Sequence, residues 1–139
     1  MARILVIEDN AGTMKLTALV LQSAGHTVLS AADAETGLAL ARTSQPDLIL
    51  MDVMLPGMDG LAATALLKAD PATAAIPIIA LTSMLTKSDE KKATAAGCDA
   101  YIAKPFRRQE LNATIEDLLK AAIDALLLKS GPPAATAEP

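Results

Sequence analysis

Polar residues that could do chemistry stand directly after short apolar runs at four separate places in this sequence. They are two neighbouring acids, a third acid, a hydroxyl and a lysine, namely Glu8, Asp9, Asp52, Thr82 and Lys104. If the apolar runs are parallel strands, their carboxyl ends meet at one edge of a sheet, where open α/β sheets bind ligands. The sequence therefore predicts one acidic site in which these side chains converge.

The residue types at this site favour phosphoryl transfer. Three close carboxylates repel one another and raise each other's pKa unless a cation lies among them. Oxygen ligands of this charge suit Mg²⁺. With Mg²⁺ in place, Lys104 and the Thr82 hydroxyl could hold the oxygens of a phosphoryl group in transfer. A carboxylate can itself be the nucleophile, and Asp52 is the best-placed candidate.

The elements that must position these residues alternate in type along the chain. Segments with helical spacing separate five apolar runs, which are Ile4–Ile7, Thr27–Ala31, Leu48–Met51, Ile78–Leu81 and Ala100–Ala103. Asp59 is expected to cap one helix at its start, Pro71 to end that helix, and Gly25 and Gly97 to follow two others. This pattern predicts an α/β fold, a parallel sheet with helices on both faces and right-handed crossovers.

The last helix is expected to run from about residue 108 to 129 and to overshoot the sheet. At 1.5 Å per residue it would be roughly 33 Å long, against about 20 Å for a six-residue strand. A partner or a second copy could cover its exposed apolar end, which makes a homodimer through this helix possible. We expect one domain at residues 2–129 and a disordered tail at 130–139.

Composition excludes several classes of protein. The chain has 139 residues, a single Cys98 and a formal net charge of −4. It has no run of about 18 apolar residues, so no membrane span is expected, and one cysteine fits a reducing cytoplasm. Its scattered basic residues argue against direct binding to nucleic acid. His26, next to Gly25, is expected to be an exposed turn residue.

Four separated motifs resemble the receiver domain of bacterial two-component response regulators. They are IEDN at 7–10, LILMDVMLPGMDG at 48–60, ALTS at 80–83 and YIAKPF at 101–106. Their spacing is also similar to that of the family, and the likeness is greatest to stand-alone receivers, including the cell-division type. The resemblance implies a doubly wound, five-stranded parallel sheet of the flavodoxin-like kind, with strand order 2-1-3-4-5.

The resemblance also implies roles in phosphoryl acceptance. Asp52 would take a phosphoryl group from a sensor histidine kinase or a histidine phosphotransfer protein. Asp9 would bind Mg²⁺ directly, Glu8 would bind it through water, and Met54 would contribute its backbone carbonyl. Glu8 departs from the commoner aspartate, but its longer side chain can still reach a metal-bound water.

Three further positions resemble the parts of the family that sense the phosphoryl group. Thr82 and Tyr101 would form the switch pair, and Lys104 would contact the phosphoryl oxygens. The Lys104–Pro105 bond is expected to be cis. The implied output is altered binding to a downstream protein, and the chain is not expected to be an enzyme beyond its own phosphorylation and slow dephosphorylation.

Other interpretations compete with this one. Asp52 alone could be a turn or cap residue, and Glu8 and Asp9 could simply favour the dipole of the first helix. A P-loop NTPase would need the GxxxxGK[ST] phosphate cradle, which is missing. A haloacid-dehalogenase-type phosphatase would need a second acid where Met54 stands. The remaining alternative is a receiver-like scaffold that signals without phosphorylation, against which the complete set of acids argues.

Overall fold

Strands and helices alternate through the whole of the described chain. The computed structural model describes residues 2–55, 57–83 and 87–130. The elements in chain order are β1 (Arg3–Ile7), α1 (Ala11–Ser23), β2 (Thr27–Ala31), α2 (Ala34–Ser44), β3 (Leu48–Asp52), α3 (Gly60–Ala69), β4 (Ile78–Thr82), α4 (Lys87–Ala96), β5 (Ala100–Ala103) and α5 (Arg108–Ser130).

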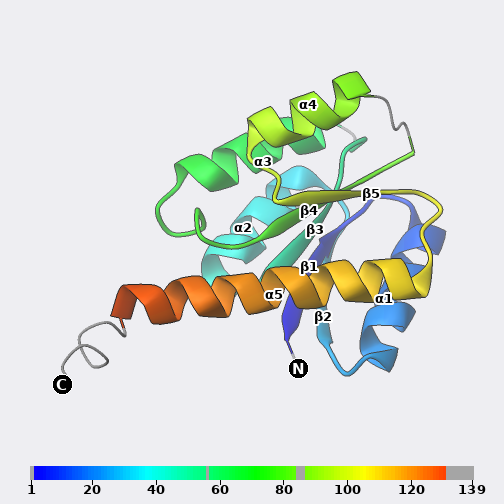
Figure 1. Ribbon diagram of the computed structural model, residues 1–139. Coiled ribbons are helices and arrows are strands. Elements are labelled where there is room, and N and C mark those ends of the chain that lie inside the picture. The colour runs from blue at the N-terminus through cyan, green and yellow to red at the C-terminus, as the bar shows by residue number, and fades with distance from the viewer. Residues whose placement is uncertain (1, 56, 84–86, 131–139) are drawn as a thin grey trace, which may run out of the picture.

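The five strands form one parallel sheet with the order β2-β1-β3-β4-β5. Helices α1 and α5 lie on one face, and α2, α3 and α4 lie on the other (Figure 1). The strand order reverses after β1, because β2 lies on one side of it and β3 on the other. The predicted α/β fold and the strand order implied by the resemblance are therefore confirmed, and β1 and β3 flank the point where a ligand is expected.

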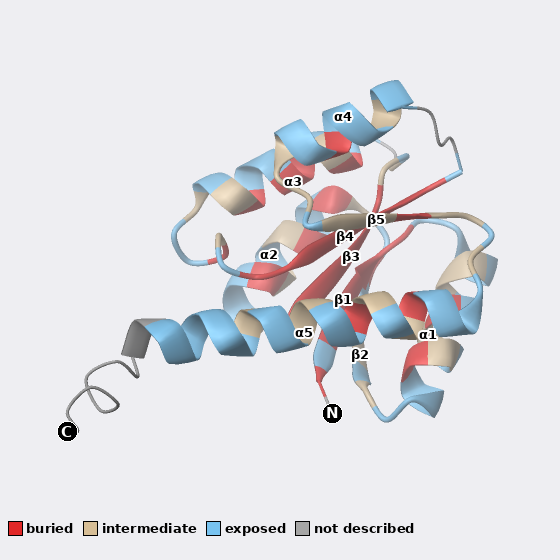
Figure 2. Cartoon of the chain, viewed as in Figure 1, coloured by how far each residue is buried: buried red, intermediate tan, exposed pale blue. Residues whose placement is uncertain are grey.

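Two apolar clusters hold the layers together. Alternate residues of each strand point to opposite faces, so that Ile4 and Val6 of β1 pack with α1 and α5, while Leu5 and Ile7 pack with α2 and α3. Every residue of β3 and β4 is buried, as the red central strands of Figure 2 show. Strands buried on both faces read as continuous apolar runs, which is why the sequence pattern located them.

The strand ends carry the site residues themselves. Strands β3 and β4 end at Asp52 and Thr82, one residue later than the apolar runs predicted, and both residues are buried. The ladder continues beyond the strands, because the backbone N–H groups of Glu8, Val53 and Lys104 donate to the carbonyls of neighbouring strands at 2.8–3.0 Å. The backbone at this edge is thus held by the sheet.

Most local signals in the sequence have the expected structural role. The Asp59 side chain caps α3 by accepting from the Leu61 N–H at 2.6 Å, and Gly25 and Gly97 follow their helices with φ of 92° and 104°. The expectation for His26 was wrong. This residue is half-buried, and its Nδ1 accepts a hydrogen bond from the Ala2 N–H at 3.1 Å.

Helix α5 extends past the amino edge of the sheet (Figure 1). It ends at Ser130, one residue beyond the predicted end, and residues 131–139, where the tail was expected, lie outside the described part. In the ranges that the structure describes, no helix has both the length and the apolar character needed to cross a membrane.

Candidate phosphoryl-acceptor and metal site

Asp52 is placed by a tight junction between the end of β3 and the start of α3. The Gly60 N–H donates to the Val53 carbonyl at 3.0 Å, and a Cβ atom on Gly60 would overlap the carbonyl oxygen of Asp52. Only glycine therefore lets α3 begin this close to the strand. The Asp52 residue is 4% exposed, and its Oδ1 accepts from the Met54 N–H at 3.0 Å.

Glu8, directly after β1, and Lys104, directly after β5, lie beside Asp52 in the site. The Lys104 Nζ lies 2.6 Å from Glu8 Oε1 and 3.4 Å from Asp52 Oδ1. The other oxygen of Glu8 accepts from the Asn10 N–H at 3.1 Å. Glu8 is only 2% exposed, so its charge is compensated by an ammonium group and a backbone donor instead of water.

The two buried acids have pKa values that move in opposite directions. Burial, together with a hydrogen bond to Glu8 and the charge of Glu8, raises the pKa of Asp52 to about 6, although the Met54 N–H and Lys104 act to lower it. Burial would also raise the pKa of Glu8. The hydrogen bonds that Glu8 accepts from Asp52, Lys104 and the Asn10 N–H lower it instead. Below about pH 6, when no cation is present, the pair therefore shares one proton, held by Asp52.

The donor set fits a small hard cation. One carboxylate oxygen from each of Glu8, Asp9 and Asp52 lies within 4.8 Å of the other two, and Asp9 is exposed while its neighbours are buried. Around an octahedral ion with oxygen ligands at 2.0–2.1 Å, ligand oxygens are about 3–4 Å apart, so small side-chain adjustments would form the shell. The exposed side, at Asp9, leaves room for water and for a phosphoryl oxygen.

Thr82 and Tyr101 belong to β4 and β5, which lie on the opposite side of β3 from β1. The Thr82 side chain is 5% exposed, and its carbonyl accepts from the Lys104 N–H at 2.8 Å. Tyr101 is half-buried, and the pKa of its phenol is raised, first by desolvation and then by a hydrogen bond and repulsion from Glu90 of α4. The Tyr101 hydroxyl therefore faces α4 in this state.

The structure brings together most of the residues that the sequence singled out. Glu8, Asp9, Asp52 and Lys104 form one cluster, and the Lys104–Pro105 peptide bond is cis, as the resemblance implied. For Met54 the expected contact was from its backbone carbonyl to a metal ion. The structure shows its backbone N–H donating to Asp52, and the residue is 59% exposed.

Two contributors were missed at the sequence level. Asn10 belongs to the IEDN motif, but it contacts Glu8 through its backbone N–H. Any residue other than proline has this donor, so the residue type does not reveal the contact. Glu90 was missed because nothing in the sequence pairs a residue of α4 with Tyr101. For Asn10 the motif itself was a usable signal, since a buried acid needs nearby backbone donors.

Comparisons with known proteins agree with this site. The family model described as "Response regulator receiver domain" matches residues 4–116. Protein PilH of Pseudomonas aeruginosa is 41% identical over 120 residues, covering 86% of this chain and 98% of PilH. The polar-differentiation response regulator DivK of Brucella anthropi is 38% identical over 116 residues, covering 84% and 94% of the two chains.

A longer relative shows that such a region also occurs as part of a larger protein. The DNA-binding dual master transcriptional regulator RpaA of Synechocystis is 37% identical over 139 residues, which are 95% of this chain but only 58% of RpaA. Among solved structures, the receiver domain of a Pseudomonas aeruginosa sensor histidine kinase has a TM-score of 0.81 and 34% identity, covering 86% of this chain and 98% of that chain. It was solved with magnesium coordinated in its active-site cleft.

Proposed function

This chain belongs to the response regulator receiver-domain family, and we propose that it accepts a phosphoryl group on Asp52 from a phosphohistidine and then changes its binding to a downstream protein. The donor is a histidine kinase or a histidine phosphotransfer protein, the two classes with which receiver domains interact. Such donors, together with the free thiol of Cys98, fit action in the cytoplasm.

The chemistry is a displacement at phosphorus. An Asp52 oxygen attacks, the bond from phosphorus to the donor's imidazole nitrogen breaks, and that nitrogen leaves with the bonding electrons and takes up a proton. Asp52 reacts as the carboxylate, the form that predominates above its pKa of about 6. A bound Mg²⁺, with Asp9 and Asp52 as direct ligands, Glu8 through water and the Met54 carbonyl, would offset the negative charge of the acids and of the incoming phosphoryl group.

Lys104 is the group that changes partner in this proposal. Its Nζ holds Glu8 at 2.6 Å and is 3.4 Å from Asp52, so a small shift takes it onto an oxygen of a phosphoryl group on Asp52. Thr82, at the end of the neighbouring strand, donates its hydroxyl to a second oxygen. When the Thr82 side chain moves toward the phosphoryl group, it leaves space behind it. Tyr101 then leaves Glu90 and turns into that space, which alters the surface of α4, β5 and α5.

One observation carries this function. Asp52, a buried acid that is 4% exposed, ends a central strand within reach of two further acids and of the Lys104 ammonium group. A carboxylate in a purely structural role at this place would need a permanent partner of opposite charge at close distance, whereas Lys104 lies closer to Glu8.

The test is incubation with acetyl phosphate and Mg²⁺ followed by intact-protein mass measurement. We expect the wild type to gain one phosphoryl group and Asp52→Asn to gain none. Asp59→Asn is the matched control, because it changes a nearby acid to a residue that caps α3 equally well, and it should be phosphorylated like the wild type. An unmodified wild type with Mg²⁺ present would favour the alternative, a receiver-like scaffold that works without phosphate.

A further inference from the structure

The last two turns of α5 overhang the amino edge of the sheet. The helix has 23 residues, about 34 Å at 1.5 Å per residue, whereas the five-residue strands span about 17 Å. Leu111 and Ile115 are buried against the sheet, but Ile123 and Leu127, further along, are 58% and 60% exposed. The end of the helix thus presents apolar side chains that the sheet does not reach.

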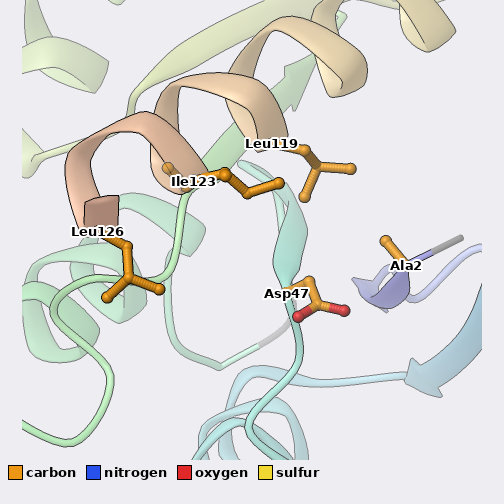
Figure 3. Close-up of a pocket in the computed structure, with 6 residues that line it drawn as sticks. Ala2, Asp47, Leu119, Ile123 and Leu126 are labelled. Atoms are coloured by element: carbon orange, nitrogen blue, oxygen red, sulfur yellow. The ribbon is translucent and has the colours of Figure 1, made fainter. Parts of the chain in front are cut away.

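A hollow of about 380 Å³ lies beneath this overhang. It is lined by Ala2, Asp47, Leu119, Ala122, Ile123 and Leu126. Figure 3 shows Leu119, Ile123 and Leu126 on α5 and, across from them, Ala2 at the start of the chain and Asp47 before β3. The hollow is therefore continuous with the apolar side of the helix end.

A row of alternating charges runs along one flank of the same helix end. Leu119, Ile123 and Leu127 stand four residues apart and form an apolar stripe. Beside the stripe, Glu116, Lys120 and Asp124 are also spaced by four residues, and all three are exposed. The order of signs is negative, positive, negative. This row decides how a second copy of the helix could lie against the first.

We propose that the overhanging end of α5 pairs with the same segment of a second copy, antiparallel about a two-fold axis. A two-fold interface requires one patch to be complementary to itself. When two copies of a helix lie antiparallel, the same flank of both helices lies along their contact. A two-fold axis near residue 122 then sets Lys120 of each copy opposite Asp124 of the other. The apolar stripes then cover each other. Parallel pairing would instead set this row against the other flank of the second helix, so that Lys120 would not meet Asp124.

The chemistry of the surface favours a second copy over a membrane. The chain has a formal net charge of −4, and Glu116 and Asp124 lie beside the apolar stripe, so an anionic lipid surface would repel it. The paired segments are only two to three turns long, which places the interface below about 1,200 Å², the range of weak and transient contacts. We therefore expect a monomer at a few µM and a substantial dimer fraction at several hundred µM.

Sedimentation velocity between about 5 and about 500 µM tests the pairing. The wild type should show a concentration-dependent dimer, and Ile123→Glu, at the centre of the stripe, should weaken it at least tenfold. Leu19→Glu is the matched control, since Leu19 is 61% exposed on α1, away from the helix end, and it should dimerise like the wild type. A wild type that stays monomeric throughout, or an unaffected Ile123→Glu dimer, would contradict the proposal.

A charge exchange separates pairing between copies from effects within one helix. Lys120→Glu and Asp124→Lys should each weaken the dimer several-fold, because each sets like charges opposite one another in two places. An equimolar mixture of the two variants should regain dimer, since the introduced glutamate of one chain then faces the introduced lysine of the other, and the two unchanged residues also form an opposite-charge pair. A mixture no stronger than either variant alone would overturn the antiparallel arrangement. Asp52→Asn should dimerise like the wild type, so the outcome does not depend on phosphorylation.

Discussion

The carboxyl and amino edges of the sheet break the ordinary rule of burial in opposite ways. At the carboxyl edge, Glu8 and Asp52 are charged or acidic groups that are 2% and 4% exposed, and at the amino edge Ile123 and Leu127 are apolar groups that are more than half exposed. A buried polar group and an exposed apolar patch are the informative exceptions in a folded protein. At each edge, binding of a ligand or a partner could lower the free energy, by compensating the buried acids at one edge or by covering the apolar side chains at the other.

The two edges differ in how rigidly they hold these groups. The acids of the carboxyl edge are fixed by the continued ladder, by Lys104 and by the junction at Gly60. The helix end at the amino edge has no strand beneath it (Figure 2). Changes at the carboxyl edge should therefore have larger effects on stability than changes at the amino edge, and the following experiments test that order.

The largest effect is expected from Gly60→Ala. Alanine normally stabilises a helix relative to glycine, but here its Cβ would overlap the carbonyl oxygen of Asp52, so α3 must move away from β3. We expect a loss of about 2–4 kcal/mol of unfolding free energy in urea titrations. Gly57→Ala is the control, because φ is +79° but no atom lies within 4 Å of the added Cβ, and it should cost about 1 kcal/mol. Equal losses would mean that the tight junction is not important.

Magnesium should stabilise the fold by a comparable amount, because it offsets repulsion among Glu8, Asp9 and Asp52. A ligand that binds only the native state at a hundredfold excess over its Kd adds about 2.7 kcal/mol. Thermal melts with and without Mg²⁺ should separate for the wild type, and Asp9→Ala should remove the difference. An unchanged Mg²⁺ shift in Asp9→Ala would show that the metal binds elsewhere.

Without metal, Asp52→Asn should stabilise the protein at neutral pH. The pKa of Asp52 is about 6 in the fold and 3.8 ordinarily, so between these values the native state binds the proton that the unfolded state releases, and stability falls as pH rises. Below the lower value both states are protonated and the penalty vanishes. The variant should gain roughly 1–3 kcal/mol at pH 7 and little at pH 4. A gain that is the same at both pH values would mean that ionisation of Asp52 is not its cause.

The sequence was a good guide to the carboxyl edge for physical reasons that do not hold at the amino edge. Buried parallel strands must be apolar, so the acids, Thr82 and Lys104 that interrupt or end them stand out, and parallel strands must deliver their ends to one place. At the amino edge only the overshoot of α5 was predicted, and it followed from a different quantity, the lengths of the helix and the strands. Contacts between backbone groups and side chains left no such pattern, which is why the Asn10 N–H to Glu8 was missed.

His26 shows the same limit at the amino edge. A histidine beside a helix-ending glycine looks like an exposed turn residue, yet the return of the chain brings it against the start of β1, where its Nδ1 accepts from the Ala2 N–H. That contact joins residues 24 positions apart, and no local signal predicts it. Side-chain partners of this kind are therefore set by the tertiary structure and leave no signal in the local sequence.

The smallest effect is expected from this histidine. Burial, and then the charge of the chain's amino terminus, lower the pKa of His26, against the attraction of Glu116. Its contribution to stability is thus full above the ordinary value of 6.5 and is lost as pH falls below it, the opposite of Asp52, because protonation in the unfolded state is easier than in the native state. His26→Asn keeps an acceptor for the Ala2 N–H but does not titrate. Between pH 7.5 and pH 5 the wild type should lose less than about 1 kcal/mol relative to this variant. The comparison is best made in the Asp52→Asn background, where the larger titration of the carboxyl edge is absent. A wild type that gains stability relative to His26→Asn on acidification would mean that Glu116 outweighs burial, and that the amino edge favours a charged histidine.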